Sequence, residues 1–145
     1  MTTSAQPFPY SVTIEVAFRD LDAMGHVNNA VYLSYLETAR IKFLMDLLDL
    51  KHLSELPMIM AEATISYKSP AFYGEQLIVG VGVSRFGGKS FDIVSQITGG
   101  DGRLVALAKT VQVAFDYAAG QTIAVPEALK ARVRALQGDW QLPAD

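Results

Sequence analysis

The chain has 145 residues, of which 50% are hydrophobic and 19% are charged, and its formal net charge at pH 7 is -3. This length fits one domain with a single buried core, and the composition argues against a disordered chain. A net negative charge gives no basic footprint, so we expect no nucleic-acid partner. We interpret residues 1–145 as a single domain whose segments 1–9 and 139–145 are loose ends.

The sequence contains no cysteine and only two histidines, His26 and His52. Disulfides, thiolate metal sites and a cysteine nucleophile are therefore excluded, and we expect neither a bound metal nor a cofactor. The first residues lack the basic and apolar segments of a secretion signal, and no apolar run approaches the ~20 residues of a membrane span. We expect a cytoplasmic protein without a membrane partner.

The first predicted element is a β-strand over residues 11–18. Its apolar residues alternate with polar ones, namely Val12, Ile14, Val16 and Phe18. This period of two is typical of a strand with one buried face. The alternation stops in the polar segment 19–28, which contains Asp20, Asp22 and Gly25 and is interpreted as a loop.

A long α-helix is predicted after this loop. Asn28 or Asn29 can cap it, because an Asn side chain accepts hydrogen bonds from the unpaired N–H groups of a first turn. The apolar residues that follow recur at steps of three and four, namely Tyr32, Tyr35, Leu36, Ala39, Phe43, Leu47 and Leu50. The helix should end near Asp49, and its apolar stripe requires a partner surface.

Four further segments are strand-like, namely residues 58–70, 75–86, 89–98 and 103–117. The turns FGGK and TGGDG supply glycines that hairpins favour, and no helical pattern separates these strands. Short connections force antiparallel pairing, so the chain is predicted to be α+β, with five antiparallel strands packed on one long helix. A last, short surface helix is predicted within 125–138, with Pro126 at its first position and Gly138 as its stop.

In this order, the strand, acidic loop, long helix and four antiparallel strands resemble the hotdog-fold thioesterases of the 4-hydroxybenzoyl-CoA thioesterase-like family. The resemblance rests on RDLDAMGHVNNAVYLSYLETAR, ISYKSPAFYGEQLIV, GGKSF and VQVAFD, and it covers nearly the whole chain. It implies a five-stranded antiparallel sheet wrapped around the central helix. It also implies an acyl-CoA thioesterase, which hydrolyses an acyl-CoA thioester to a free carboxylic acid and coenzyme A.

The resemblance assigns the catalytic carboxylate to the second aspartate of the loop, Asp22. A thioester carbonyl needs attack either by a carboxylate or by water that a carboxylate deprotonates, so Asp22 is predicted to be nucleophile or general base. The carbonyl oxygen gains negative charge, and we assign the backbone N–H of Asn29 as its oxyanion donor. The competing interpretation is that Asp20 and Asp22 only make local hydrogen bonds.

Other residues near the loop receive lesser roles. Asp20 is expected to be structural, holding the loop or pairing with Arg19. His26 is assigned an orienting role towards substrate, with an ordinary loop hydrogen bond as the alternative. The aromatic residues Tyr32, Tyr35 and Phe43 are expected in the core, although a tyrosine early in the helix is also suited to an acyl pocket.

Coenzyme A carries phosphates that basic side chains and turn N–H groups bind. The segment RFGGKS offers Arg85, Gly88, Lys89 and Ser90 at a hairpin, and the corresponding turn of the resembled family lies near the nucleotide. We assign these four residues to the coenzyme A part of the substrate. The alternative is an exposed hairpin with solvated charges.

We expect a homo-oligomer, either a dimer or a dimer of dimers. One such sheet leaves an open edge, and the resembled family joins two sheets edge to edge with active sites between subunits. Two other functions stay open. One is a non-catalytic acyl-CoA-binding or regulatory module on the same fold. The other is a hotdog dehydratase, which needs a catalytic histidine facing an acid across the helix, and His26 in the loop fits that role poorly.

Overall fold

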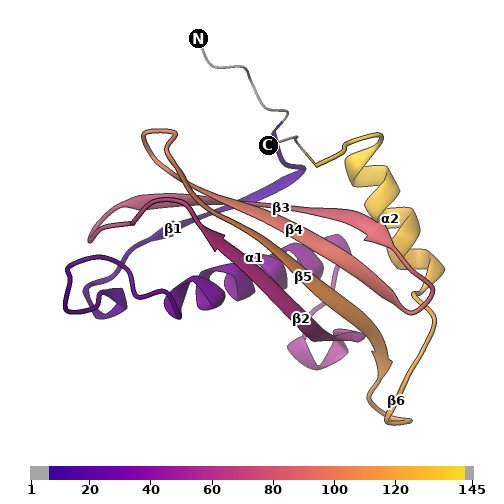
Figure 1. Cartoon of the computed structure of the whole chain (residues 1–145). Helices are drawn as coiled ribbons and strands as arrows, with labels where there is room; N and C mark the ends of the chain where they lie inside the picture. Colours follow the sequence, from indigo (N-terminus) through magenta and orange to yellow (C-terminus); the bar gives the residue numbers. More distant parts are fainter. Residues whose placement is uncertain (1–6, 143–145) are drawn as a thin grey trace.

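The computed structural model describes residues 7–142 of the chain. Within this range one antiparallel sheet curls around helix α1 (Val31–Leu47), which crosses its inner face (Figure 1). The strands are β1 (Tyr10–Glu15), β2 (Met58–Tyr67), β3 (Gln76–Phe86), β4 (Ser90–Gly99), β5 (Leu104–Asp116) and β6 (Gln121–Thr122). The sheet order is β1-β3-β4-β5-β2, with the short β6 paired to β5. The predicted arrangement of five strands and one long helix is confirmed.

The core lies between α1 and the inner face of the sheet. The helix buries its predicted stripe there, including Tyr32, Tyr35, Leu36, Ala39 and Phe43. Strand β3 faces this stripe with the buried Leu77, Val79, Val81 and Val83. The core positions of the three aromatic residues of α1 are therefore confirmed. Residues three and four apart share one face of a helix, alternate residues share one face of a strand, and here these two apolar faces pack against each other.

Both ends of the loop segment differ from the sequence prediction. Strand β1 ends at Glu15 instead of Phe18, because its partner β3 begins opposite Glu15, at Gln76. The chain then turns through a 3-10 helix, η1 (Phe18–Asp20), and Phe18 is 78% exposed. Helix α1 begins at Val31 and ends at Leu47, slightly shorter than predicted. A second 3-10 helix, η2 (Leu53–Glu55), leads into β2.

Helix α2 (Glu127–Gln137) stops directly before Gly138, as predicted, and this glycine has a φ of 57°. Pro126 precedes the helix as its N-cap instead of opening it. Leu129 and Val133 are buried, whereas Leu136 of the predicted stripe is 44% exposed. Besides these two apolar positions, Gln137 holds the helix to β3 by bonding the Val83 N–H and carbonyl at 2.7 and 2.9 Å.

The outer face of the sheet receives aromatic residues from both end segments. A Cβ atom at Gly80 would lie 2.7 Å from the ring of Phe8, and one at Gly82 would lie 2.6 Å from the ring of Trp140. The two rings contact each other, with centroids 5.2 Å apart. The expectation of loose ends over 1–9 and 139–145 therefore does not hold for Phe8 and Trp140. Residues 1–6 and 143–145 lie outside the described range.

Candidate active site

The predicted catalytic loop is a compact turn closed by backbone hydrogen bonds. Leu21 and Val27 form an isolated antiparallel bridge across its neck. Inside this bridge the Asp22 N–H donates to the His26 carbonyl at 3.0 Å, and the Gly25 N–H donates to the Asp22 carbonyl at 3.1 Å. Gly25 has a φ of 87°, which glycine adopts without strain. The loop conformation is thus specified locally.

Asp22 is half-buried, and one of its carboxylate oxygens is used within the turn. Oδ1 accepts a hydrogen bond from the Met24 N–H at 2.9 Å. Among residues 7–142, Oδ2 has no hydrogen-bond donor or ion-pair partner. The local bond expected of an ordinary loop aspartate is therefore present, and it orients the carboxylate while leaving one oxygen open for a reacting group.

Asp20 holds the loop to the rest of the protein through one carboxylate oxygen and its backbone carbonyl. Its Oδ2 accepts hydrogen bonds from the Tyr35 hydroxyl at 2.7 Å and from the Ala17 N–H at 2.9 Å. Its carbonyl accepts from the Asn28 N–H at 3.0 Å. Burial, followed by the bond to Asp20, raises the pKa of Tyr35. Asp20 fits its expected structural role through Tyr35, since the described residues contain no Asp20–Arg19 ion pair.

The two asparagines have different tasks at the start of α1. The Asn28 side chain accepts from the Ala30 N–H at 2.8 Å, and its carbonyl accepts from the Val31 N–H at 2.9 Å. Asn28 therefore shapes the turn before the helix, while Ala30 occupies the N-cap position without a side-chain bond. The Asn29 N–H has no acceptor within the described part of the chain. An unpaired N–H at a helix start suits a developing oxyanion.

A pocket of about 290 Å³ lies beside these groups. It is lined by His26, Val27, Asn29, Tyr32, Tyr67, Lys68, Ser69 and Pro70. Two predicted site residues, His26 and Asn29, therefore meet in one pocket. Asp22 does not line it and is linked to it through the backbone bond to His26. His26 packs its ring edge-on to Phe72, with centroids 6.4 Å apart.

The far wall of this pocket was missed by sequence reasoning. Residues 67–70 come from the end of β2, at the open edge of the sheet. Tyr67 donates its hydroxyl to the Asn29 carbonyl at 3.0 Å. These residues lie within the motif ISYKSPAFYGEQLIV, but nothing local in that motif shows that β2 ends beside the start of α1. Tyr32 belongs to the core, as expected, and also lines this pocket.

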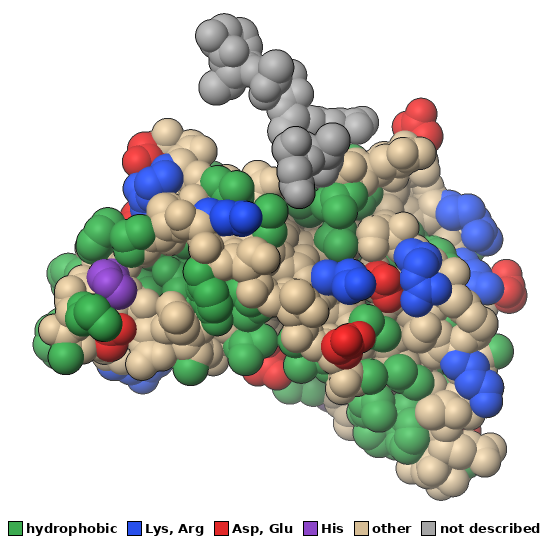
Figure 2. Space-filling view, viewed as in Figure 1, with side chains coloured by type: hydrophobic (Ala, Val, Ile, Leu, Met, Phe, Trp, Pro, Cys, Tyr) green, Lys and Arg blue, Asp and Glu red, His purple; other side chains and the backbone are tan. Residues whose placement is uncertain are grey.

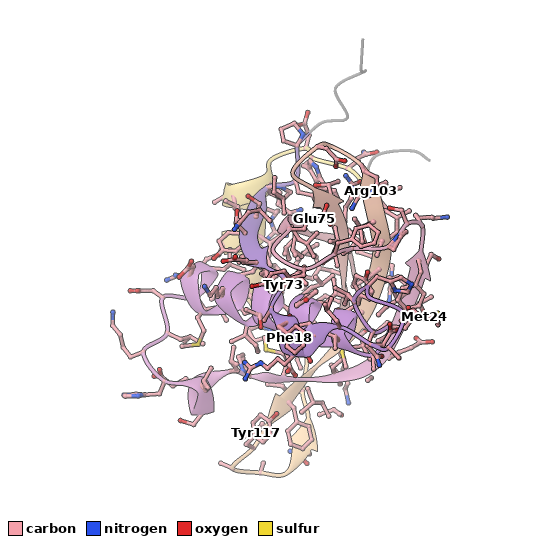
Figure 3. All side chains as sticks on the ribbon, turned by 90° about the vertical axis from the view of Figure 1, so that its left-hand side faces the viewer. Phe18, Met24, Tyr73, Glu75, Arg103 and Tyr117 are labelled. Atoms are coloured by element: carbon pink, nitrogen blue, oxygen red, sulfur yellow. The ribbon has the colours of Figure 1, made fainter. Side chains whose placement is uncertain are left out.

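The segment that follows this wall is braced by Arg103. Its guanidinium pairs with Glu75 at 2.6 Å and Asp101 at 2.9 Å, and it also donates to Ser69 Oγ at 3.1 Å. Glu75 in turn accepts from the Phe72 N–H at 3.1 Å. Figure 3 shows Glu75 and Arg103 side by side at this end of the molecule.

The braced segment supports the loop that contains Asp22. The Val27 N–H donates to the Ala71 carbonyl at 2.9 Å, and His26 bridges Phe72. Phe18 and Tyr73 extend the contact outside the loop, with ring centroids 6.5 Å apart (Figure 3). In Figure 2 apolar side chains gather at this end of the molecule, on the left of the view. The loop thus rests on residues 71–73, which Arg103 holds in place.

The predicted coenzyme A residues lie elsewhere. Arg85 pairs with the buried Asp92 through two hydrogen bonds of 3.2 and 3.3 Å. Lys89 approaches Thr122 Oγ1 at 3.5 Å, and the Gly88 carbonyl accepts from the Val125 N–H. The Ser90 carbonyl accepts the Gly87 N–H at 2.7 Å and closes the hairpin.

Within the chain this hairpin and the loop that contains Asp22 occupy opposite ends of the sheet (Figure 1). Strand β3 begins at Gln76, beside the loop end of β1, and runs for 11 residues to the hairpin. At ~3.3 Å per residue this is roughly 35 Å. The structure therefore does not bring Arg85, Gly88, Lys89 and Ser90 together with Asp22 inside one chain.

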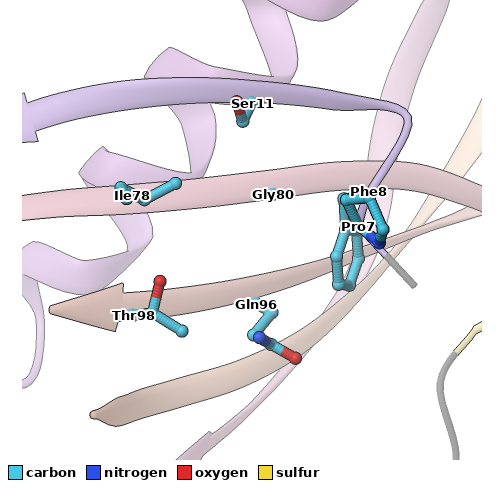
Figure 4. Close-up of a pocket in the computed structure, with 7 residues that line it drawn as sticks. All are labelled: Pro7, Phe8, Ser11, Ile78, Gly80, Gln96 and Thr98. Atoms are coloured by element: carbon cyan, nitrogen blue, oxygen red, sulfur yellow. The ribbon is translucent and has the colours of Figure 1, made fainter. Parts of the chain in front are cut away.

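A second pocket of about 220 Å³ lies on the outer face of the sheet (Figure 4). Its lining residues are Pro7, Phe8, Ser11, Ile78, Gly80, Gln96 and Thr98. None of them carries an acidic or basic side chain, so this pocket offers no general base. Within residues 7–142 no group of three or more His, Asp or Glu side chains is arranged to hold a metal ion. None of the helices in that range has the length and apolar character needed to cross a membrane.

The family model of the Thioesterase-like superfamily matches residues 16–133. A thioesterase from Thermus thermophilus, crystallised in complex with coenzyme A and Zn, is 36% identical and has a TM-score of 0.83, with 92% of this chain and 97% of that chain covered. No curated protein matches the chain.

More distant structures share the fold. A predicted thioesterase from Bacillus stearothermophilus is 22% identical with a TM-score of 0.83, covering 92% of this chain and 98% of that one. A 1,4-dihydroxy-2-naphthoyl-CoA thioesterase from Synechocystis is 18% identical with a TM-score of 0.76, covering 86% and 94%. The hotdog fold and the thioesterase resemblance predicted from the sequence are confirmed. Since the family match spans most of its length, the chain belongs to the Thioesterase-like superfamily.

Proposed function

We propose that this thioesterase hydrolyses an acyl-CoA thioester to a free carboxylic acid and coenzyme A, without a metal, through Asp22 and the Asn29 N–H. The proposal rests on two groups without a partner in residues 7–142, the Asp22 Oδ2 atom and the Asn29 N–H, which belong to the same hydrogen-bonded turn region before α1. Asp22 keeps Oδ2 open while Oδ1 is fixed by Met24. Asn29 lines the adjoining pocket, and its N–H has no acceptor in residues 7–142.

Two mechanisms use these groups. In the first, Asp22 removes a proton from water as the oxygen attacks the carbonyl carbon, and collapse of the tetrahedral intermediate breaks the C–S bond to release the thiol. In the second, the carboxylate attacks and forms a mixed anhydride as the thiolate leaves, and water then hydrolyses the anhydride. In both, the Asn29 N–H stabilises the oxyanion. His26, which lines the pocket, orients the substrate.

Coenzyme A is the proposed carrier of the acyl group. The Thermus thermophilus thioesterase, which is 36% identical, was crystallised with coenzyme A, and this supports the same ligand here. The hairpin with Gly88, Lys89 and Ser90 supplies a basic side chain, a hydroxyl and turn N–H groups for its phosphates. Arg85 is the weaker candidate because Asp92 already occupies its guanidinium.

The functional unit is proposed to be a dimer, alone or within a dimer of dimers, formed through the open edge of β2. This edge presents apolar side chains, with Ile59 38% and Met60 43% exposed. The Tyr67 end of β2 lies at the catalytic loop and its Met58 end lies towards the hairpin. Antiparallel pairing of two β2 strands about a twofold axis brings the hairpin of one subunit to the loop of the other. Such pairing supports an active site shared between subunits.

The test is release of free thiol from a panel of acyl-CoA thioesters of graded length, including aromatic acyl groups. We expect turnover of at least one class, with acyl-pantetheine a poorer substrate because it lacks the nucleotide. Tight binding of acyl-CoA without thiol release would instead identify a non-catalytic acyl-CoA-binding module. A cytoplasmic location remains a prediction from the sequence, and fractionation of cells that express the protein tests it.

A further inference from the structure

Three tyrosines connect the edge strand β2 with the catalytic loop. The rings of Tyr67 and Tyr32 are 5.4 Å apart, and those of Tyr32 and Tyr35 are 6.0 Å apart. Tyr35 donates its hydroxyl to Asp20, and Tyr67 donates its hydroxyl to the Asn29 carbonyl. Tyr32 and Tyr35 are buried, whereas Tyr67 is 46% exposed. Tyr67 is therefore the outer member of an aromatic row whose inner members belong to the core.

The hydrogen bond from Tyr67 constrains the peptide between Asn29 and Ala30, which directly follows the unpaired Asn29 N–H. The peptide between Asn28 and Asn29 is fixed on its carbonyl side by the Val31 N–H at 2.9 Å, which directs the Asn29 N–H the other way. The next peptide presents the Asn29 carbonyl, and Tyr67 holds it at 3.0 Å. The two peptide planes meet at the Asn29 Cα, so fixing both limits rotation there. The direction of the Asn29 N–H is set from both sides.

No other described residue holds the Asn29 carbonyl, within the range 7–142. The position is also exposed and precedes the first helical residue, so the helix itself does not restrain it. Without the Tyr67 hydroxyl the carbonyl would turn towards water, and the neighbouring N–H would lose part of its restraint. Oxyanion donors act by being oriented before the reaction, so a loss of orientation lowers turnover.

We propose that Tyr67 is a positioning residue for the oxyanion site: its hydroxyl fixes the Asn29 carbonyl and thereby aims the Asn29 N–H into the pocket. This inference rests on the proposed thioesterase mechanism. It predicts that removing the Tyr67 hydroxyl slows the chemical step without weakening substrate binding. One hydrogen bond of this kind accounts for about a 3- to 10-fold change in rate.

The experiment compares Tyr67→Phe with Tyr10→Phe in the full chain, using the acyl-CoA that the wild-type protein hydrolyses best. Tyr10 is the matched control, because its hydroxyl also makes one bond, to Asp46 Oδ2 at 2.6 Å, on the strand at the other edge of the sheet. For Tyr67→Phe we expect kcat to fall about 3- to 10-fold with an unchanged KM and an unchanged melting temperature. For Tyr10→Phe we expect wild-type kcat.

Several outcomes would overturn the inference. An unchanged kcat in Tyr67→Phe would show that the hydroxyl does not orient the site. A raised KM with normal kcat would make Tyr67 a substrate contact instead. An equal loss in both variants, or a loss that follows a lowered melting temperature, would indicate a structural role. Failure of the wild-type protein to release thiol from any acyl-CoA would overturn the proposed function itself, which is a different and recognisable result.

Discussion

The two ends of the sheet are built in different ways. At the loop end, backbone bonds close the turn around Asp22, and Arg103 braces the segment beneath it through Glu75, Asp101 and Ser69. At the hairpin end, the Arg85 guanidinium is paired with Asp92, and Lys89 has one long contact to Thr122. The loop end is thus rigid with two groups left open for chemistry. The hairpin end has a loosely held cation, Lys89, which only the proposed dimer would bring to the loop of the other subunit.

The largest expected effect is at Asp22. Asp22→Asn keeps the shape of the side chain but can neither attack nor accept a proton, so turnover should fall roughly 10²- to 10⁴-fold with little change in melting temperature. Thiol release and thermal melting are measured together. Asp20→Asn is the matched control, since the Asp20 carboxylate accepts hydrogen bonds from Tyr35 and Ala17. Weakening these bonds should lower the free energy of unfolding by about 1 kcal/mol. Near-normal turnover by Asp22→Asn would refute the mechanism.

The next prediction tests whether activity requires the loop end of one subunit to lie beside the hairpin end of another. Ile59→Lys places a charge on the open β2 edge, and in a twofold dimer both subunits carry this charge at the interface. Association should therefore weaken about 10- to 100-fold, and activity should fall as the dimer dissociates. Ile78→Lys is the control, because Ile78 is similarly exposed, at 42%, but lies away from that edge. Light scattering and turnover are followed over a dilution series. A fully active wild-type monomer would rule out the shared site.

A smaller effect is expected from the brace at the loop end. Arg103→Gln leaves Glu75, whose side chain is only 17% exposed, without its cation. We expect a loss of about 1 to 3 kcal/mol in unfolding free energy, together with a several-fold loss of turnover because residues 71–73 support the loop. Lys130→Gln on α2 is the control, since it removes an ion pair to the exposed Glu127 that is worth under about 0.5 kcal/mol. Equal melting temperatures for the two variants would contradict the brace.

The smallest effects concern the hairpin end, where two basic residues have different partners: Arg85 pairs with Asp92, whereas Lys89 has one long contact to Thr122. Lys89→Ala should raise the KM for acyl-CoA about 3- to 10-fold without affecting stability. Arg85→Ala should mainly lower stability, because it leaves the buried Asp92 unpaired. Substrate titrations and melting curves distinguish the two results. If neither variant changes KM, singly or combined, the nucleotide binds elsewhere.

The sequence by itself determined the features that depend on neighbours in the chain. The helix stripe from Tyr32 to Phe43, the turn at Gly25 and the hairpin glycines were all predictable, because hydrophobic period and turn chemistry act over a few residues. The loop motif also led to Asp22 and to the superfamily, although the catalytic role of Asp22 stays a prediction. Alternation alone misjudged Phe18, since it does not show where the partner strand begins.

Only the tertiary structure decided which distant segments meet. Tyr67 reaches Asn29 across 38 positions of sequence, and Arg103 reaches Glu75 across 28. Strand order and register create both contacts, and they also place the 85–90 hairpin far from the loop within one subunit. A local pattern sets the buried face of a strand but not its neighbour or the residue opposite, because these follow from how all strands close around α1.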